Sequence, residues 1–177
     1  MVQDKTIQYP LRGSNAKNHP LAKDMLSIHE VTEVGEYDEI YYLAPPDKKY
    51  KPTKLERLVN NGFDDSDGYY RLVSGDQIAY RFELIEMIGK GAFGQVIKCK
   101  DHKSGAHVAI KMVKNQKKYY YQAAVEAKLL LLLKENDPEG VERVVKLQDY
   151  FVWRNHLCIV FDLYSINLYE FIKMYDY

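Results

Sequence analysis

Three glycines in one short stretch constrain this chain more than any other feature. Gly89, Gly91 and Gly94 have G-x-G-x-x-G spacing, and the segments 84–88 and 95–100 on either side read as strands. A glycine inside a strand costs about 0.5–1 kcal/mol relative to alanine, so three together favour a tight turn or the close approach of a ligand. Phosphate oxygens are a common ligand of such exposed backbone N–H groups. A glycine-rich hairpin that binds nothing remains the alternative from the triplet alone.

The residues after the glycines distinguish three kinds of phosphate-binding loop. A Rossmann loop continues into a helix and has an acidic residue about 20 positions on, whereas this chain continues as a strand and has Lys114 and Asn115 there. A Walker A loop requires Gly-Lys-Ser/Thr, which is missing. Instead, a turn at 101–105 leads into a third strand at 107–113, which contains V-A-I-K ending at Lys111. The glycine loop and V-A-I-K together resemble the amino-terminal lobe of protein kinases.

Charge and composition limit the classes of partner that the chain is expected to bind. With 46% hydrophobic and 28% charged residues, the 177-residue chain predicts one ordered domain with an extension. Because 25 basic and 25 acidic residues cancel, we expect neither a nucleic-acid nor a membrane partner. From Lys98 to Lys118, however, seven lysines accompany a single acid, Asp101. This local field suits a polyphosphate, although a solvated strand face is the alternative for every lysine except Lys111.

The two cysteines and the apolar pattern indicate an intracellular chain. Cys99 and Cys158 both fall in expected strands and lack C-x-x-C spacing, which favours buried free thiols in a reducing compartment. The first residues lack the apolar run of a signal peptide, and no stretch approaches 18 consecutive apolar residues.

The amino-terminal part reads as a tail followed by an extension. Residues 1–19 are predicted to form a flexible tail. Ser27 and Glu30 have capping-box spacing, and 37–43 suggests a short strand or docking segment. A proline- and lysine-rich linker spans 44–54, and an acidic turn follows at 62–73 that lacks the EF-hand register of a calcium site. An ordered extension with no role of its own is an equally good interpretation.

A helix expected at 122–134 supplies a candidate partner for Lys111. Glu126 lies one turn from Ala123 and Leu130, beside the apolar face that should meet the sheet. A buried carboxylate needs a counter-charge, and Lys111 is the obvious one. In kinases such a pair positions the lysine over the ATP phosphates. The alternative is a surface glutamate paired with Lys128 or Lys134.

Two further strands complete the expected fold. Segments 144–152 and 157–163 flank Arg154-Asn155 and predict a β-hairpin. Ser165 is a candidate N-cap for a last helix with Leu168 and Phe171 on one face. The fold class is therefore α+β: a protein-kinase-like N-lobe with a five-stranded antiparallel sheet, one long helix and an amino-terminal accessory extension.

Longer matching stretches narrow the resemblance to one kinase family. The segments AYRFELIEMIGKGAFGQVIKCKDHKSGAHVAIKMVKN, QAAVEAKLL and FVWRNHLCIVFDLYSINLYEFIK resemble the dual-specificity tyrosine-regulated kinases (DYRK). GFDDSDGYYRLVSGDQIAYRFEL resembles their homology box, and LSIHEVTEVGEYDEIYYL the accessory segment of class II members. The resemblance divides the chain into the accessory region and homology box at 20–80 and an incomplete kinase domain at 81–177, which ends at the start of a helix.

The resemblance implies ATP as cofactor and assigns residues to it. Lys111 and Glu126 are the expected catalytic residues. Val96 and Ala109 would contact the adenine, Phe161 would be the gatekeeper, the backbone of Asp162 and Tyr164 would bind the base, and Asn167 would lie near the ribose. The full expected nucleotide site is Ile88, Gly89, Lys90, Gly91, Ala92, Phe93, Gly94, Gln95, Val96, Ala109, Lys111, Phe161, Asp162, Leu163, Tyr164 and Asn167.

The resemblance also implies an activity that the printed chain should not complete alone. Family members phosphorylate serine and threonine in protein substrates after one tyrosine autophosphorylation, and they act as monomers. The resemblance suggests a cytoplasmic or nuclear location. The H-R-D-x-x-x-x-N, D-F-G and A-P-E motifs do not occur here, so we expect no metal ligand in this chain and the Mg²⁺ ligands in a missing C-lobe. A fragment of a full kinase is the favoured interpretation. A non-catalytic nucleotide-binding or interaction module is the alternative.

Two positions depart from the family pattern. Tyr164 stands where an aliphatic residue is usual, which should reshape the mouth of the pocket. The run 129–133 is all leucine, where relatives have polar residues. We expect its outer side to pack against the amino-terminal extension.

Overall fold

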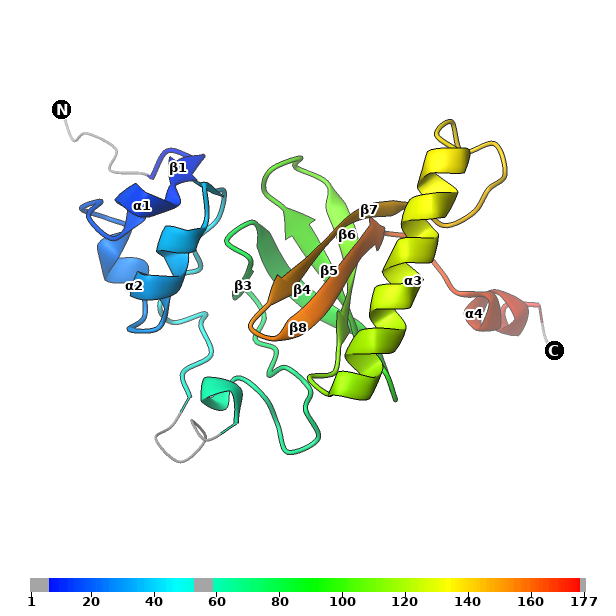
Figure 1. Ribbon diagram of the computed structural model, residues 1–177, viewed down its shortest axis with the longest axis horizontal. Coiled ribbons are helices and arrows are strands. Elements are labelled where there is room, and N and C mark those ends of the chain that lie inside the picture. Colours follow the sequence, from blue (N-terminus) through cyan, green and yellow to red (C-terminus); the bar gives the residue numbers. More distant parts are fainter. Residues whose placement is uncertain (1–6, 53–58, 176–177) are drawn as a thin grey trace.

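The computed structural model describes residues 7–52 and 59–175 (Figure 1). The extension consists of short elements: β1 (Leu11–Arg12), α1 (Gly13–Ala16), η1 (Lys23–Met25), α2 (Glu30–Glu33), η2 (Val34–Glu36), β2 (Glu39–Ile40) and η4 (Asn60–Gly62). Strands β1 and β2 pair antiparallel. Residues 11–16 therefore belong to the packed extension and differ from the flexible tail predicted for 1–19. Gly13 explains the difference, because a Cβ there would lie 2.1 Å from the Tyr37 carbonyl oxygen and only glycine permits this approach.

A six-stranded antiparallel sheet forms the centre of the molecule. Its strands are β3 (Gln77–Ile78), β4 (Phe82–Gly91), β5 (Gly94–Asp101), β6 (His107–Val113), β7 (Leu147–Trp153) and β8 (His156–Asp162), in the spatial order β3-β4-β5-β6-β8-β7. The five long strands are those that the sequence predicts. The sixth, β3, is new, because a two-residue strand is too short to show a period in the sequence.

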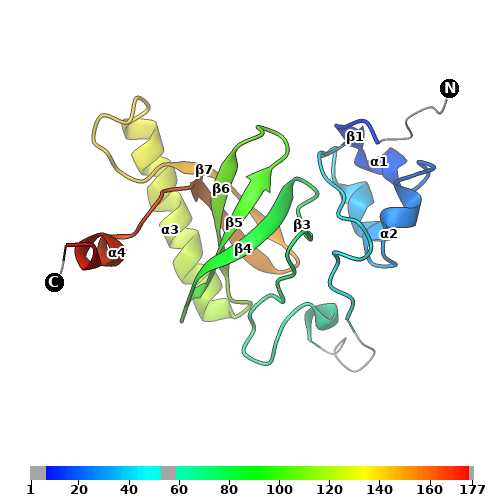
Figure 2. The ribbon, with the colours of Figure 1, turned by 180° about the vertical axis from the view of Figure 1, so that it is seen from behind.

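The two faces of the sheet pack against different parts of the chain. Along β5 every second residue is buried, as Ile97 and Cys99 are. These side chains join Ile110 and the extension residues Val34 and Ile40 in one apolar cluster. On the opposite face a second cluster forms between the sheet and α3 (Lys117–Asn136) from Val113, Ala123, Ala127, Leu130, Leu147, Leu157 and Ile159. The extension and α3 thus lie on opposite sides of the sheet (Figures 1 and 2).

This arrangement corrects the prediction for the leucine run. Leu129, Leu132 and Leu133 are 57%, 55% and 42% exposed, so they do not pack against the extension. The sheet lies between the extension and α3, and the exposed leucines lie on the part of α3 that the sheet does not cover. The helix also begins at Lys117 rather than at residue 122, where the polar and aromatic residues obscured its start in the sequence.

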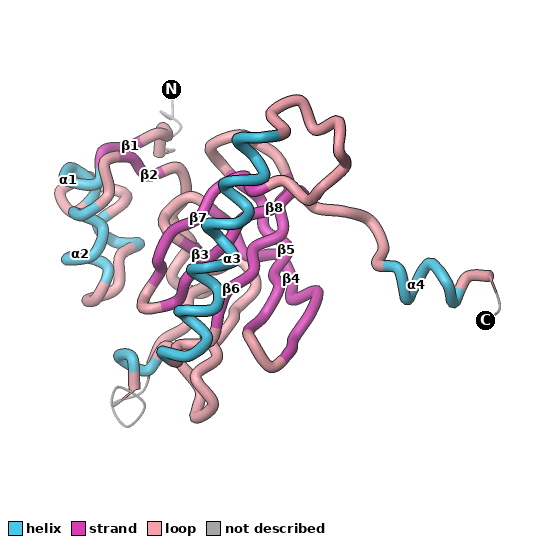
Figure 3. The backbone as a smooth tube through the Cα atoms, turned by 45° about the vertical axis from the view of Figure 1, so that its right-hand side comes forward, coloured by secondary structure: helices cyan, strands magenta, loops and turns pink. Residues whose placement is uncertain are grey.

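The chain after the sheet leaves the body of the molecule. Arg154 and Asn155 close the predicted hairpin between β7 and β8 with positive φ angles of 44° and 69°. The last helix, α4 (Leu168–Lys173), is capped by Asn167 and not by Ser165. The Asn167 side chain accepts the Glu170 N–H at 2.8 Å, and Glu170 accepts the Asn167 N–H. Figure 3 shows α4 projecting from the sheet on an extended segment.

Polar contacts in the extension follow two of the predicted patterns. Glu30 accepts the Ser27 N–H at 2.7 Å, and the Ser27 hydroxyl accepts the Glu30 N–H, as a capping box requires. The acidic segment forms a turn in which the Asp65 carboxylate accepts the N–H groups of Asp67 and Tyr69. Both cysteines are buried and free.

Candidate nucleotide-binding site

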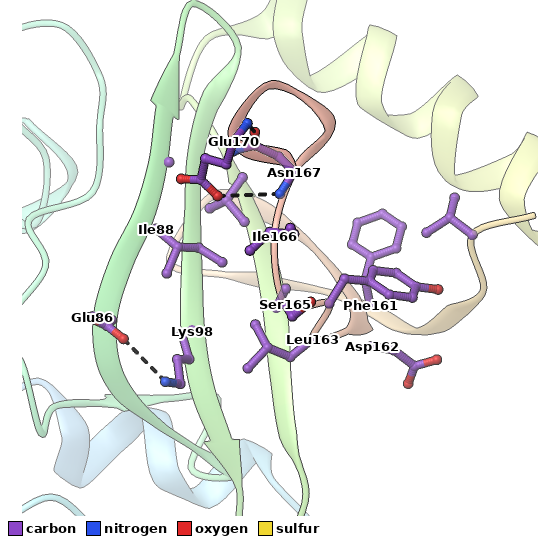
Figure 4. A pocket seen from close by; sticks show the side chains of 15 residues that line it. Glu86, Ile88, Lys98, Phe161, Asp162, Leu163, Ser165, Ile166, Asn167 and Glu170 are labelled. Carbon is purple, nitrogen blue, oxygen red and sulfur yellow. Dashed lines mark hydrogen bonds and ion pairs between the residues drawn. The ribbon is translucent and has the colours of Figure 1, made fainter. Parts of the chain in front are cut away.

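An open cleft with a volume of about 960 Å³ lies beside the segment that follows β8. Its size is in the range of ligand pockets, about 300–1,000 Å³. Figure 4 shows the lining side chains between β4 and β5 on one side and residues 161–170 on the other. The lining residues are Glu86, Ile88, Gly89, Val96, Lys98, Ala109, Val145, Phe161, Asp162, Leu163, Tyr164, Ser165, Ile166, Asn167 and Glu170.

Strand register explains why these residues meet. In the sheet, Phe161 pairs with Ala109, and Ala109 pairs with Lys98. Paired residues in an antiparallel sheet share a face, so all three point into the cleft and away from the extension. Phe161 also packs against the apolar cluster under α3, which places it at the back of the cleft. The gatekeeper role of Phe161 stays a prediction.

The contact predicted between Lys111 and Glu126 is present. Lys111 Nζ donates to both Glu126 carboxylate oxygens at 2.7 Å, from the middle of β6 to the middle of α3. Lys134, an alternative partner, instead donates to the Gln148 carbonyl oxygen. The side chains of the pair are 29% and 40% exposed, so the pair is not buried as the sequence suggested. Water screens such a pair, and its contribution to stability falls to at most about 1 kcal/mol.

Lys111 lies near the cleft without lining it. It follows Ala109 by two residues on β6 and shares its face, which separates the two Cα atoms by roughly 7 Å. On the neighbouring strands it pairs with Val96 and Ile159. The ammonium group therefore sits on the same face as the cleft, further along the strands toward the glycine loop. A ligand that fills the cleft and extends along β6 would reach it.

The glycines of the loop have different structural roles. A Cβ on Gly94 would lie 2.2 Å from the Met112 carbonyl oxygen, so the sheet itself excludes any side chain there. A Cβ on Gly91 would have no heavy atom within 4 Å, and one on Gly89 would make an ordinary contact with Val96 at 3.7 Å. The protein packing therefore does not require Gly91 or Gly89. Bare backbone at these positions fits a loop that a phosphate group approaches closely.

The structure separates the expected nucleotide site into two groups. Ile88, Gly89, Val96, Ala109, Phe161, Asp162, Leu163, Tyr164 and Asn167 line the cleft, whereas Lys90, Gly91, Ala92, Phe93, Gly94, Gln95 and Lys111 do not. The tip of the loop bends toward the start of α3, where Phe93 contacts the Tyr119 ring. Gln95 alternates with Val96, so its side chain lies on the opposite face and is 6% exposed. Only its backbone can face the cleft.

Sequence reasoning missed Glu86, Lys98, Val145, Ser165, Ile166 and Glu170. Lys98 could have been found, because it alternates with the core residues Ile97 and Cys99 along β5. Glu86 could not, because it has the parity of the core residues Phe82 and Leu84, and an irregularity between Leu84 and Glu86 shifts its register. Glu86 and Lys98 form an exposed ion pair at 3.3 Å near the mouth of the cleft (Figure 4). The sequence predicts Val145 inside a strand at 144–152, whereas β7 begins at Leu147 and Val145 lies in the loop before it.

Metal and membrane features are absent from the described residues. No cluster of three His, Cys, Asp or Glu side chains with metal-binding geometry occurs in 7–52 and 59–175. Among the helices of the same residues, none combines the length and the apolar character needed to cross a bilayer.

Comparison with known proteins identifies the class that this fold and cleft define. The chain belongs to the protein kinase family, whose domain matches residues 82–175, more than half of the chain.

Within that family the chain is similar to DYRK kinases. It is 44% identical to "Dual specificity tyrosine-phosphorylation-regulated kinase 4" of Homo sapiens and 43% identical to "Dual specificity tyrosine-phosphorylation-regulated kinase 2" of Drosophila melanogaster, over 86% and 88% of its length. These matches necessarily extend into the residues before 82. The chain spans only 29% and 22% of those two proteins.

Proposed function

We propose that this chain forms the ATP-binding part of a dual-specificity protein kinase, which transfers the γ-phosphate of ATP to Ser, Thr and Tyr hydroxyls of protein substrates. The observation that carries the proposal is the Lys111–Glu126 pair on the face of the sheet that holds the cleft and the glycine loop. A glycine-rich hairpin or a lysine–glutamate pair by itself would not distinguish a kinase. Their combination on one face matches what phosphoryl transfer needs from a kinase N-lobe.

The chain's own residues then hold the nucleotide. Val96 and Ala109 contact the adenine, and the backbone of Asp162 and Tyr164 binds its edge. Asn167 uses its side-chain oxygen to cap α4 and has its amide nitrogen left for the ribose hydroxyls. Lys111, oriented by Glu126, contacts the phosphates. ATP brings the phosphoryl group, and Mg²⁺ neutralises its charge, with ligands that we place outside these residues.

The activity of the whole enzyme follows from the same proposal. The chain by itself transfers no phosphate, because the printed sequence has no H-R-D or D-F-G motif to supply the base and metal ligands. Maturation proceeds by tyrosine autophosphorylation, and the kinase acts as a cytoplasmic monomer. The boundaries that we propose are an accessory region at 20–80 and the N-lobe from 81.

The surface of α4 favours a kinase domain over a free-standing module. Leu168, Tyr169, Phe171, Ile172, Met174 and Tyr175 are all exposed, from 43% to 72%. Contiguous apolar surface of this kind is unusual on monomers and is normally covered by other protein. Reading the transcript beyond the codon for Tyr177 distinguishes the two: encoded H-R-D and D-F-G motifs support the kinase, and an immediate stop codon supports the module.

Nucleotide binding tests the site directly. We expect ATP, titrated to millimolar concentration, to shift the amide NMR signals of Gly89, Gly91 and Ala109. Lys111→Met removes a charge-assisted contact to phosphate, which is worth about 1.5–3 kcal/mol, and should weaken binding by about ten- to a hundredfold. Lys100→Met, on β5 but outside the cleft, is the matched control and should bind like the wild type. Equal affinity of wild type and Lys111→Met would refute the assigned role.

A further inference from the structure

Tyr69 connects the acidic turn to the tip of the glycine loop. Its hydroxyl donates to the Gly91 carbonyl oxygen at 2.8 Å. Two ammonium groups lie over its ring, with Lys90 Nζ 4.0 Å and Lys114 Nζ 4.1 Å from the ring centroid. Lys90 belongs to the loop end of β4, and Lys114 to the segment between β6 and α3. One side chain therefore contacts the loop and the base of the helix that carries Glu126.

The turn that presents Tyr69 is itself fixed. The Asp65 carboxylate accepts the Tyr69 N–H at 2.9 Å, and the Asp65 N–H donates to the Tyr69 carbonyl oxygen. The Gly68 carbonyl oxygen accepts the Asn115 N–H at 2.9 Å, and Gln116 Nε2 donates to the Asp67 carbonyl oxygen at 3.1 Å. The turn is thus attached to residues 115–116, just before α3. It does not depend on the loop for its position.

The loop tip, in contrast, has few contacts of its own. Gly91 and Gly94 form the last pair of the β4–β5 ladder. Space surrounds Gly91, and the Phe93 side chain is 53% exposed. Gly94 also pairs with Val113 on β6, so the weakly held part of the tip is 91–93. Apart from Tyr69 and the strand pairing, this part has the Lys114 N–H donated to the Phe93 carbonyl oxygen at 3.0 Å and the Phe93–Tyr119 ring contact among the described residues. A segment with so few contacts opens at low free energy unless it is held from outside.

We propose that Tyr69 is a positioning residue that holds the tip of the glycine loop in a fixed position relative to the cleft and thereby sets the affinity for the nucleoside triphosphate. The inference rests on the proposed function, because the loop must bind phosphate for its position to matter. A held loop loses little freedom when it closes on a ligand, whereas a free loop must be ordered by the ligand and binds it less tightly. The hydroxyl supplies the hold on the backbone, and the ring orders the two lysines that flank it.

Two substitutions separate the contributions of the hydroxyl and the ring. Tyr69→Phe removes only the hydrogen bond to Gly91, and Tyr69→Ala also removes the contact with Lys90 and Lys114. The control is Tyr121→Phe, because Tyr121 is 68% exposed on α3, and no hydrogen bond of its hydroxyl occurs among the described residues. All three variants should unfold thermally like the wild type, since the altered contacts lie at the surface.

Hydrogen–deuterium exchange measures the loop without any nucleotide. A single neutral hydrogen bond changes such an equilibrium by about two- to tenfold. We therefore expect the amides of residues 91–93 to exchange about two- to tenfold faster in Tyr69→Phe, and faster again in Tyr69→Ala, with no change in β7 and β8. Unchanged exchange in both variants overturns the inference, as does faster exchange spread over the whole sheet.

The ATP titration then links the loop to the cleft. The dissociation constant should rise about two- to tenfold in Tyr69→Phe and stay unchanged in Tyr121→Phe. If the wild type binds no ATP, the proposed function fails, and the exchange experiment alone decides whether Tyr69 holds the loop. If the wild type binds ATP and Tyr69→Phe binds equally well, the proposed function stands and Tyr69 has no positioning role.

Discussion

Arg154 should contribute more to stability than any other charged side chain at the junction of extension and sheet. It sits in the turn between β7 and β8, and its side chain is only 7% exposed. The guanidinium donates to both Glu33 carboxylate oxygens at 2.9 Å and to the Tyr70 hydroxyl at 2.9 Å. It also lies over the rings of Phe63 and Trp153, 3.9 Å and 4.3 Å from their centroids. These contacts join the hairpin to the extension.

Substitution of Arg154 by methionine keeps much of the volume but leaves Glu33 without its counter-charge. Removing one partner of a buried ion pair costs about 3–5 kcal/mol. For a chain of this size, that loss lowers the midpoint of thermal unfolding by about 6–20 °C. Burial alone would lower the pKa of Arg154, but Tyr70, Glu33 and Glu30 outweigh burial and raise it. The arginine therefore stays charged in the folded chain.

Urea unfolding followed by circular dichroism measures this free energy, and Arg143→Met is a matched control. Arg143 also has a positive φ, 54° against 44° for Arg154, but it is exposed. Any backbone strain from the substitution is therefore common to both, and the control should change stability by less than about 0.5 kcal/mol. Combining Arg154→Met with Glu33→Gln should cost at least about 1 kcal/mol less than the sum of the single changes. A loss below about 1 kcal/mol, or strict additivity, would show that the extension does not depend on this pair.

Three other buried groups, one carboxylate and two thiols, give independent predictions. The Asp64 carboxylate accepts hydrogen bonds from His156, Asn60 and Asn115. Burial alone would raise the pKa of Asp64, but these hydrogen bonds outweigh burial and hold the pKa below 3.8. Asp64→Asn should therefore lower the free energy of unfolding, measured in urea at neutral pH, by about 1–3 kcal/mol. The difference in unfolding free energy between the variant and the wild type should shrink below about pH 4, where the carboxylate becomes protonated. A constant difference down to acid pH would contradict this. Burial raises the pKa of Cys99 to about 12 and also raises that of Cys158, so both thiols should react with a disulfide reagent only as fast as the chain unfolds. Rapid labelling of the folded chain would show that one thiol is accessible.

The sheet could be predicted from the sequence because its strands are long and have clear boundaries. Glycines and the Arg154-Asn155 turn bound several of the long strands, V-A-I-K lies inside β6, and each strand has enough residues to show alternation. Short elements such as β3 and α1 have no measurable period, and they exist because distant residues pack on them. Gly13 shows this, since its tight fit against Tyr37 depends on a contact 24 positions along the chain.

The candidate site also has features that the sequence predicts and features that depend on distant packing. Lys111 and Glu126 could be paired from sequence, because strand and helix periodicity give the direction of both side chains. The degree of exposure of that pair could not be predicted, since it depends on which segments cover the helix. The prediction that the leucine run packs against the extension was wrong for the same reason. Amphipathicity shows that a helix has an apolar face, but it does not show what covers that face.

The two faces of the sheet explain how the extension can influence the cleft without touching it. In β6, Ile110 and Met112 pack toward the extension, while Ala109 and Lys111 face the cleft and α3. Because side chains of a strand alternate between its two faces, a change in packing under Ile110 should shift the backbone that carries Lys111. Tyr69 is different, because its hydroxyl contacts the glycine loop directly. Under the role proposed for Tyr69, loss of this hydrogen bond should change nucleotide affinity without loss of stability, whereas a change in packing under Ile110 should alter both.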